Sequence, residues 1–155
     1  MRAQKDTAKA LRMQACHVAD VAELERLCFA DPWSETALSM LLGDTAVGFV
    51  VCDGDRAVAY AGMMCVAGEG QITNVAVHPD YRRRGMGREV VLGLLQYARE
   101  HDFFEVSLEV RASNNAAISL YETLGFSVGG TRRGFYQKPT EDALVMLWHN
   151  AAETE

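Results

Sequence analysis

Hydrophobic and polar residues recur along this chain with two different periods, and each period predicts a different secondary structure. In the stretch 104–110, apolar and polar residues alternate strictly, which is the period-two pattern of a strand with one buried face. In the stretch 88–101, apolar residues recur every three or four positions, which predicts an amphipathic helix. The apolar positions of that helix are Val91, Leu94, Leu95 and Ala98.

Turn and capping residues predict the remaining elements. Asp20 is expected to cap a helix with Val21, Leu24, Leu27 and Cys28 on one face, and Ser34 to start a second helix. Asp-Gly-Asp at 53–55 predicts a hairpin between two β-rich runs. Asn114 or Ser113 caps a later helix that Gly125 ends. The expected order is a short strand at 13–17, two helices, three strands within 45–79, a helix, a strand, a helix, and two strands within 126–148. Helices packed on a mixed sheet are the architecture that this α/β order favours.

Composition narrows the class of protein. With 155 residues, 49% of them hydrophobic, the chain is long enough for one domain with its own core. We expect a flexible leader at 1–10, a single domain at 11–150 and a tail at 151–155. No apolar run is long enough to span a bilayer and the N-terminus has no signal-peptide pattern, so a cytoplasmic protein without membrane contact is expected. The four cysteines and four histidines lack metal-ligand spacing, so no metal is expected.

Positive charge gathers at one place in an otherwise acidic chain. The formal net charge is −6, which argues against a nucleic-acid-binding surface, yet four of the fifteen Lys and Arg residues fall within 82–88. That stretch, Arg-Arg-Arg-Gly-Met-Gly-Arg, lies between a predicted strand and a predicted helix. Free helix N–H groups and glycines that let the backbone curl form an anion cradle, although a solvated basic loop is the simpler alternative. A Rossmann site lacks its third glycine, since Val90 stands there, and a P-loop lacks its Gly-Lys-Ser/Thr.

The quoted residues also match a known family. "VAVHPDYRRRGMGREVV" (75–91) resembles the acyl-coenzyme A signature of the GNAT superfamily of N-acetyltransferases, and "LEVRASNNAAISLYETLGF" (108–126) continues the match. With "DPWSE" (31–35), the chain looks like the bacterial branch that acetylates the N-terminal alanine of a ribosomal small-subunit protein. The resemblance covers roughly 11–149. It implies the GNAT fold, a mixed and mostly antiparallel sheet of about seven strands flanked by about four helices.

The resemblance implies a site for acetyl-CoA as co-substrate. Backbone N–H groups at 83–88 would bind the pyrophosphate, and the strand at 75–77 would pair with the pantetheine arm as an added strand does. Asn114 matches a coenzyme-contacting asparagine, with a simple helix cap as the alternative. The donor-site residues are thus Val75, Ala76, Val77, Arg83, Arg84, Gly85, Met86, Gly87, Arg88 and Asn114.

Glu109 and Tyr121 are the candidate catalytic residues. Glu109 matches the family's catalytic glutamate and would take a proton from the acceptor amine, whose pKa is about 8. By its pattern alone it is an ordinary outward-facing strand residue, and Glu105 and Glu69 are the fallback bases. Tyr121 would protonate the leaving thiolate. Its alternative role is core packing, in a helical stripe with Ala117, Ile118 and Leu124.

The acceptor side rests on two segments that match loops flanking the incoming peptide. Their candidate contacts are Trp33, Arg133 and Tyr136. The expected acceptor is a protein N-terminus, here of a ribosomal protein, bound by a monomer or weak dimer. Two other hypotheses stay open, which are acetylation of a small amine or lysine side chain, and a non-catalytic acyl-CoA-binding module. Cys52 and Cys65 are interpreted as small buried hydrophobes rather than acyl-carrying nucleophiles.

Overall fold

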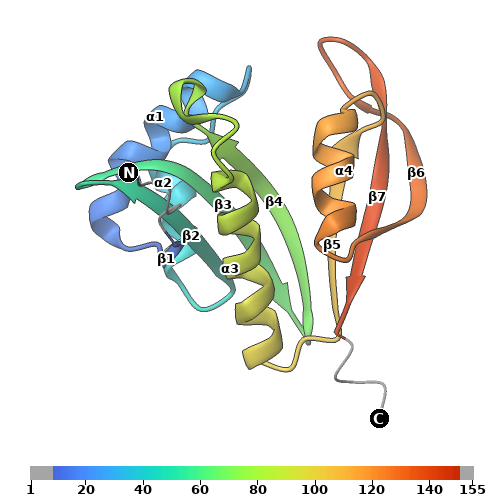
Figure 1. Ribbon diagram of the computed structural model, residues 1–155, viewed down its shortest axis with the longest axis horizontal. Coiled ribbons are helices and arrows are strands. Elements are labelled where there is room, and N and C mark those ends of the chain that lie inside the picture. Colours follow the sequence, from blue (N-terminus) through green and yellow to red (C-terminus); the bar gives the residue numbers. More distant parts are fainter. Residues whose placement is uncertain (1–8, 151–155) are drawn as a thin grey trace, which may run out of the picture.

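The computed structural model describes residues 9–150, which form one sheet with helices on both faces (Figure 1). The strands are β1 (Leu11–Arg12), β2 (Ala46–Asp53), β3 (Arg56–Val66), β4 (Glu69–Val77), β5 (Glu105–Arg111), β6 (Ser127–Tyr136) and β7 (Glu141–His149). The α-helices are α1 (Val18–Cys28), α2 (Glu35–Leu38), α3 (Met86–Glu100) and α4 (Asn115–Thr123). Short 3-10 turns cover Ala15–His17, Ser39–Leu42 and Pro79–Tyr81. The expected tail at 151–155 and most of the expected leader at 1–10 lie outside the described residues.

The seven strands are ordered β1-β2-β3-β4-β5-β7-β6, and every neighbouring pair is antiparallel except β4 and β5. Each face of the sheet carries its own apolar core. The α3 helix presents Leu94 and Leu95, both fully buried, to one core, and α1 presents Val21 and Leu24 to the other. The predicted mixed sheet with helices packed on it is therefore confirmed, and the helices cover both faces.

Most of the elements that the patterns predicted are present, and the caps explain why. Ser34 accepts from the Ala37 N–H (3.1 Å) and Asn114 accepts from the Ala117 N–H (3.2 Å), so both begin helices as expected. Gly54 turns the β2–β3 hairpin with a φ of +64°, and Gly125 ends α4 with a φ of +104°. The strand predicted over 104–110 is β5, with Val106, Leu108 and Val110 buried and alternating with partly exposed polar residues.

Three expectations about the N-terminal part are wrong. The strand predicted at 13–17 is instead β1 at Leu11–Arg12 followed by a 3-10 turn. Asp20 does not cap α1, because its carboxylate accepts from the backbone N–H of Ala57 on β3 (2.9 Å), a partner distant in sequence. Leu27 is 45% exposed rather than part of the buried face, because the apolar stripe follows Val21 and Leu24 toward the sheet.

The parallel pair β4 and β5 separates along its length. The two strands are paired only at Glu69–Gln71 with Glu105–Ser107, and beyond that point they diverge (Figure 1). A bulge in β4 contributes to the divergence. Ile72 pairs with Met63 of β3 and Asn74 pairs with Gly62, the next residue of β3, so Thr73 is an extra residue with no paired residue opposite it. The backbone of β4 beyond the bulge thus keeps β3 on one side and has an open edge on the other.

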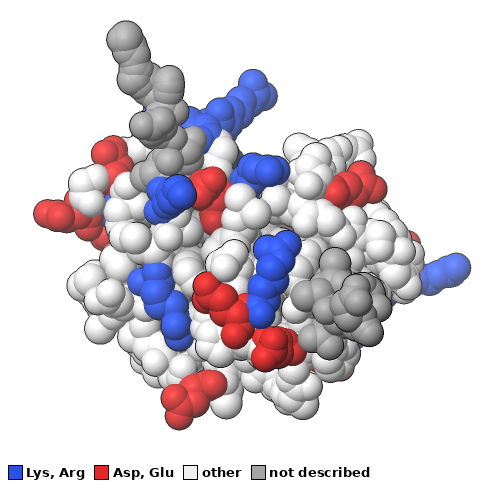
Figure 2. All heavy atoms as spheres, turned by 60° about the horizontal axis from the view of Figure 1, so that its bottom comes forward, with Lys and Arg blue, Asp and Glu red and all other residues white. Residues whose placement is uncertain are grey.

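The distribution of charged side chains on the surface is consistent with the modest net charge of the chain. On the face drawn in Figure 2, acidic and basic side chains are interspersed rather than gathered into a region of one sign. Within residues 9–150, no helix is long and apolar enough to cross a membrane.

Candidate functional site

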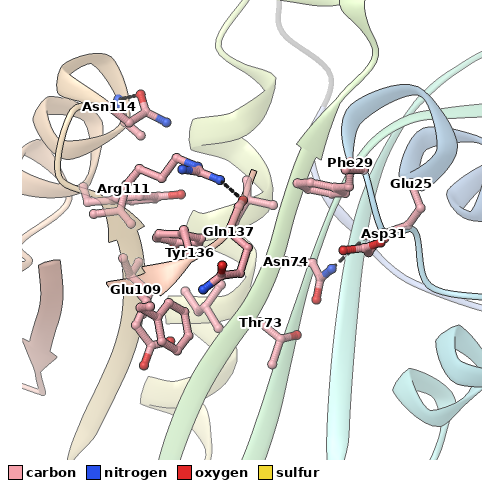
Figure 3. Close-up of a pocket in the computed structure, with 18 residues that line it drawn as sticks. Glu25, Phe29, Asp31, Thr73, Asn74, Glu109, Arg111, Asn114, Tyr136 and Gln137 are labelled. Atoms are coloured by element: carbon pink, nitrogen blue, oxygen red, sulfur yellow. Dashed lines mark hydrogen bonds between the residues drawn. The ribbon is translucent and has the colours of Figure 1, made fainter. Parts of the chain in front are cut away.

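A cavity of about 540 Å³ lies where β4 and β5 separate. Figure 3 shows β4 and α1 on one side of it, with Asn74 and Glu25, and β5 on the other, with Glu109 and Arg111. The loop after α1 and the β6–β7 connection supply further walls. The lining residues are Glu25, Phe29, Ala30, Asp31, Ile72, Thr73, Asn74, Val75, Leu108, Glu109, Val110, Arg111, Asn114, Ala117, Tyr121, Phe135, Tyr136 and Gln137.

The arginine-glycine turn leads from the open end of β4 directly into α3. Gly85 is the N-cap of α3 with a φ of +79°, a left-handed conformation that glycine adopts without a Cβ clash, and no side chain caps the helix. The first N–H groups of α3 therefore have no partner inside the helix and carry its positive dipole end. A Cβ built on Gly87 would lie 3.6 Å from Cγ2 of Val77, so the helix start lies beside the end of β4. These features fit an anionic group carried on an extended chain that follows β4.

The arginines of this turn contact neighbouring parts of the chain rather than one another. Arg82 donates from Nε to the carbonyl of Val77 (3.2 Å), and Arg84 donates to the carbonyl of Asp80 (3.3 Å). Arg88 reaches the hydroxyl of Thr123 at the end of α4 (3.4 Å). Arg83 is exposed and has a left-handed φ of +66°. The side chains thus surround the helix start with positive charge, while its backbone donors stay open.

The open edge of β4 presents hydrogen-bonding groups at alternate residues. The N–H of His78 donates to Val58 on β3 (2.8 Å), so the residue before it faces the other way. By this alternation Val77 and Val75 direct their N–H groups toward the open edge, whereas Ala76 faces β3. Two of the three residues predicted at 75–77 therefore offer backbone groups that an extended amide chain can pair with.

Glu109 projects from β5 into the cavity and is held by two side chains. Its Oε2 accepts from Arg132 of β6 (2.8 Å), and its Oε1 is 3.4 Å from Nε2 of Gln71 on β4. The Glu109 side chain is only 15% exposed, so it is shielded but still reachable from the cavity. The fallback bases Glu69 and Glu105 lie opposite each other at the closed end of the β4–β5 pair, and neither lines the cavity.

Tyr121 is part of the core and also lines the cavity, a position compatible with either role predicted for it. Its ring is buried (8% exposed) and packs edge-on against Phe126, while the residue also lines the cavity. Burial, with a smaller contribution from the neighbouring Tyr136, raises the pKa of the Tyr121 hydroxyl to about 12. The hydroxyl therefore stays protonated at neutral pH and can act as a proton donor.

The raised pKa of Tyr121 predicts an alkaline loss of stability. The unfolded chain loses this proton near pH 10. The contribution of the protonated Tyr121 hydroxyl to the free energy of unfolding is therefore intact below pH 10 and is lost as pH rises to about 12. We expect the free energy of unfolding to fall by about 2–3 kcal/mol from this group across that window. Urea unfolding at pH 9, 10 and 11 measures this change. The free energy of unfolding of Tyr121→Phe should fall less steeply with pH than that of the parent protein. Parallel curves for the two proteins would contradict the assignment.

The other predicted residues lie at different distances from the cavity. Asn114 lines it, and its side-chain oxygen caps α4, so the cap exists whether or not a ligand also binds there. Tyr136 lines it too, with its pKa raised by burial and by Glu109. Trp33 packs against the α1-side core, and Arg133 is an exposed strand residue; neither is among the lining residues.

Several residues of the cavity wall were absent from the predictions. Arg111 donates to the carbonyls of Gln137 (2.9 Å) and Pro139 (3.0 Å) and to Glu141 (3.2 Å), so it holds the β6–β7 connection against β5. The hydrogen bond from Ser113 chiefly lowers the pKa of Glu141, with Arg111 adding to it.

Arg132 was also missed, although a signal for it existed. Strand alternation in β6 favours Arg132, rather than its neighbour Arg133, on the face of Tyr136. Its ion pair with Glu109 could not be read from sequence, because β6 and β5 are separated by β7 in the sheet and by 23 residues in the chain.

Cysteine and metal chemistry find little support in the described part of the chain. All four cysteines are free, and neither Cys52 nor Cys65 lines the cavity. Burial raises the pKa of both thiols, which disfavours the nucleophilic thiolate. No group of three His, Cys, Asp or Glu side chains within residues 9–150 is placed to hold a metal ion.

Comparison with known proteins places the chain among acetyltransferases. Residues 18–126 match the family model described as "Acetyltransferase (GNAT) family". The ribosomal protein bS18-alanine N-acetyltransferase of Escherichia coli is 38% identical over 127 residues, which are 79% of this chain and 84% of that protein. The N-alpha-acetyltransferase RimI of Mycobacterium tuberculosis is 36% identical over 132 residues, 81% of this chain and 82% of that one.

A solved structure extends the similarity to the fold. The crystal structure of the ribosomal-protein-S18-alanine N-acetyltransferase from Escherichia coli superposes with a TM-score of 0.84 at 32% identity. The superposition covers 95% of this chain and 97% of that one. The overall fold is thus shared with that enzyme, and the fold predicted from the sequence is confirmed.

Proposed function

The chain belongs to the acetyltransferase (GNAT) family, and on that premise we propose that it transfers the acetyl group of acetyl-CoA to the α-amine of a protein N-terminus. The observation that carries the proposal is the cavity between β4 and β5. In that cavity the edge of β4, which leads on to the start of α3, lies near a shielded carboxylate and a buried tyrosine. The similarity to two enzymes named for N-terminal acetylation supports this acceptor class over small amines and lysine side chains.

The residues present fit acetyl-CoA as the donor substrate. The open N–H groups of α3 and the glycine cap suit its pyrophosphate, and the arginines around them attract its negative charge. The N–H groups of Val75 and Val77 suit the amides of its pantetheine arm. An N–H at this edge, next to the β4 bulge, would stabilise the negative charge that develops on the thioester oxygen during attack.

Glu109 and Tyr121 supply the proton transfers in this mechanism. The acceptor amine, with a pKa of about 8, arrives mostly protonated and must lose a proton before it attacks. Glu109 accepts that proton, directly or through a water, while Arg132 holds its Oε2. Tyr121, whose hydroxyl keeps its proton at neutral pH, returns one to the departing thiolate. Attack is direct, within a complex that holds both substrates.

The acceptor enters between the loop after α1 and the β6–β7 connection. Phe29, Asp31, Tyr136 and Gln137 form this part of the wall of the cavity that Glu109 also lines (Figure 3). We infer a ribosomal small-subunit protein as the acceptor, since the Escherichia coli relative is named for bS18. Trp33 and Arg133 lie off the cavity wall, so we assign them at most a role outside the first acceptor residue.

The proposal is tested by incubating the protein with acetyl-CoA and short peptides, and reading their masses. The peptides differ in the first residue (Ala, Ser, Met or Asp), and each carries one internal lysine. We expect a single acetyl group on the N-terminus of the peptides with a small first residue. Acetylation of lysine, or of a peptide with a blocked N-terminus, would favour the lysine or small-amine alternative. Acetylation of no amine would favour a non-catalytic acyl-CoA-binding module.

Donor binding alone makes a separate thermal prediction. A ligand that binds only the folded state at a hundred times its Kd stabilises it by about 2.7 kcal/mol, a rise in Tm of about 5–10 °C for a chain of this size. Differential scanning fluorimetry with acetyl-CoA should show this rise. Free coenzyme A should give a comparable rise, because the pyrophosphate contacts are the same. An unchanged Tm at saturating acetyl-CoA would exclude the donor site.

A further inference from the structure

The cavity wall opposite Glu109 contains a fully buried carboxylate that the mechanism above does not use. Glu25 of α1 has no exposed surface (0%). Its Oε1 accepts from the backbone N–H of Trp33 (2.9 Å), and its Oε2 accepts from Nδ2 of Asn74 (2.9 Å) and from the hydroxyl of Tyr60. None of the ion pairs formed by residues 9–150 includes Glu25, so three neutral donors compensate its burial.

The Asn74 contact ties Glu25 to the donor side of the cavity. Asn74 follows the bulged residue Thr73 and precedes Val75, whose N–H faces the open edge of β4. The Oδ1 atom of Asn74 is buried and has no hydrogen-bond partner in the described structure, so the bond to Glu25 orients this side chain. Figure 3 shows the amide of Asn74 directed toward Glu25. The position of the strand edge next to the bulge therefore depends on α1.

The Trp33 contact ties the same carboxylate to the acceptor side. The backbone carbonyl of Glu25 accepts from the N–H of Phe29 (2.9 Å), and its side chain accepts from the N–H of Trp33. The loop between these two points contributes Phe29, Ala30 and Asp31 to the cavity wall. One residue of α1 thus holds both ends of the loop.

We propose that Glu25 is a positioning residue that sets the spacing between the strand edge of β4 and the acceptor-side loop. It touches neither substrate and acts through Asn74 and Trp33. This inference rests on the proposed function, because it assigns the two walls to the donor and the acceptor. A transfer between two bound substrates is sensitive to misplacement by about 1 Å, so a buried group that fixes both walls controls the rate of that step.

The first test replaces Glu25 with Gln. This change keeps the shape but removes the negative charge and turns one accepting oxygen into an NH₂ donor. The amide of Asn74 must then turn over to present Oδ1, or its bond to residue 25 is lost. We expect kcat for peptide acetylation, measured well below the Tm, to fall by about 10- to 100-fold, with an unchanged Kd for acetyl-CoA. Tyr60→Phe is the matched control, because it removes the third donor and leaves both wall contacts, and its kcat should stay near that of the parent protein.

The second test exchanges the polarity of the Glu25–Asn74 pair. Asn74→Asp alone places two carboxylates together and should lower kcat as Glu25→Gln does. In the double variant E25Q/N74D, the amide of residue 25 can donate to the new carboxylate, so the bond is restored with donor and acceptor reversed. We expect the double variant to recover kcat above either single variant, a non-additivity that marks direct coupling. Asn74→Ser, which deletes the bond and leaves Glu25 intact, replaces Glu25→Gln should that variant not fold.

Hydrogen exchange of the backbone amides provides a readout that needs no turnover. Loss of the Glu25 contacts should speed exchange at Trp33 and at Ala76, whose N–H faces β3, and the double variant should slow it again at Ala76. If the parent protein binds acetyl-CoA but acetylates no peptide, the proposed function fails while exchange still decides whether Glu25 holds the two walls. Unchanged exchange, or unchanged kcat with only a lower Tm in Glu25→Gln, would overturn the inference.

Discussion

Replacing Glu109 with Gln is expected to lower kcat for peptide acetylation by about 10³-fold at neutral pH, within the range that a lost general base accounts for. The side chain keeps its shape and can still contact Gln71, but it no longer accepts a proton from the acceptor amine. The Kd for acetyl-CoA should stay unchanged, because the donor contacts lie on β4 and at the start of α3. Single-turnover rates with a saturating peptide, together with calorimetric Kd values, measure both quantities.

The pH dependence separates a lost base from a damaged fold. Above pH 8 the acceptor amine is increasingly deprotonated in solution, so the deficit of Glu109→Gln should narrow as pH rises toward 9. The matched control is Glu105→Gln on the same face of β5, which lies at the closed end of the strand pair beside His149 and should retain its activity. An equal deficit in both variants, or one independent of pH, would remove Glu109 from the role of base.

Gly85→Val is expected to weaken acetyl-CoA binding by about 100-fold, through backbone strain at the cap of α3 and loss of the curled path around the pyrophosphate. The φ of +79° at this position is one that a β-branched residue adopts only with strain. Arg83→Ala should weaken binding less, since that side chain adds long-range attraction while the backbone N–H groups bind directly. Calorimetric titration of acetyl-CoA into each variant at one ionic strength measures the order.

Gly54→Val is the matched control for strain. Gly54 has a φ of +64° in the β2–β3 hairpin, and a Cβ there would meet no atom within 4 Å. This variant should lose stability as Gly85→Val does and yet bind acetyl-CoA like the parent protein. A larger loss for Arg83→Ala than for Gly85→Val would mean that side-chain charge, rather than the backbone, binds the pyrophosphate.

Local chemistry explains why much of the fold was predictable. The alternation in β5, the helical stripe of α3, and the caps at Ser34 and Asn114 each depend on residues within a few positions of one another. The failures at Asp20 and Leu27 arose where a distant strand decided the outcome. Asp is a residue type that often caps helices, but the carboxylate of Asp20 instead accepts a hydrogen bond from the N–H of Ala57, 37 residues away.

The sequence by itself determined the order of elements and the glycine-containing turn at 82–88. It also determined the family of the chain, and the resemblance to that family singled out Glu109 and Tyr121 as candidates. Only the tertiary structure decided where β4 and β5 separate and which N–H groups face that opening. It also decided which side chains hydrogen-bond to the carboxylates of Glu109 and Glu25. Glu109 meets Arg132 from 23 residues away, and Glu25 meets Asn74 from 49 residues away. Such pairs depend on strand order and register, which emerge when distant segments pack around a common core and which no short pattern in the chain encodes.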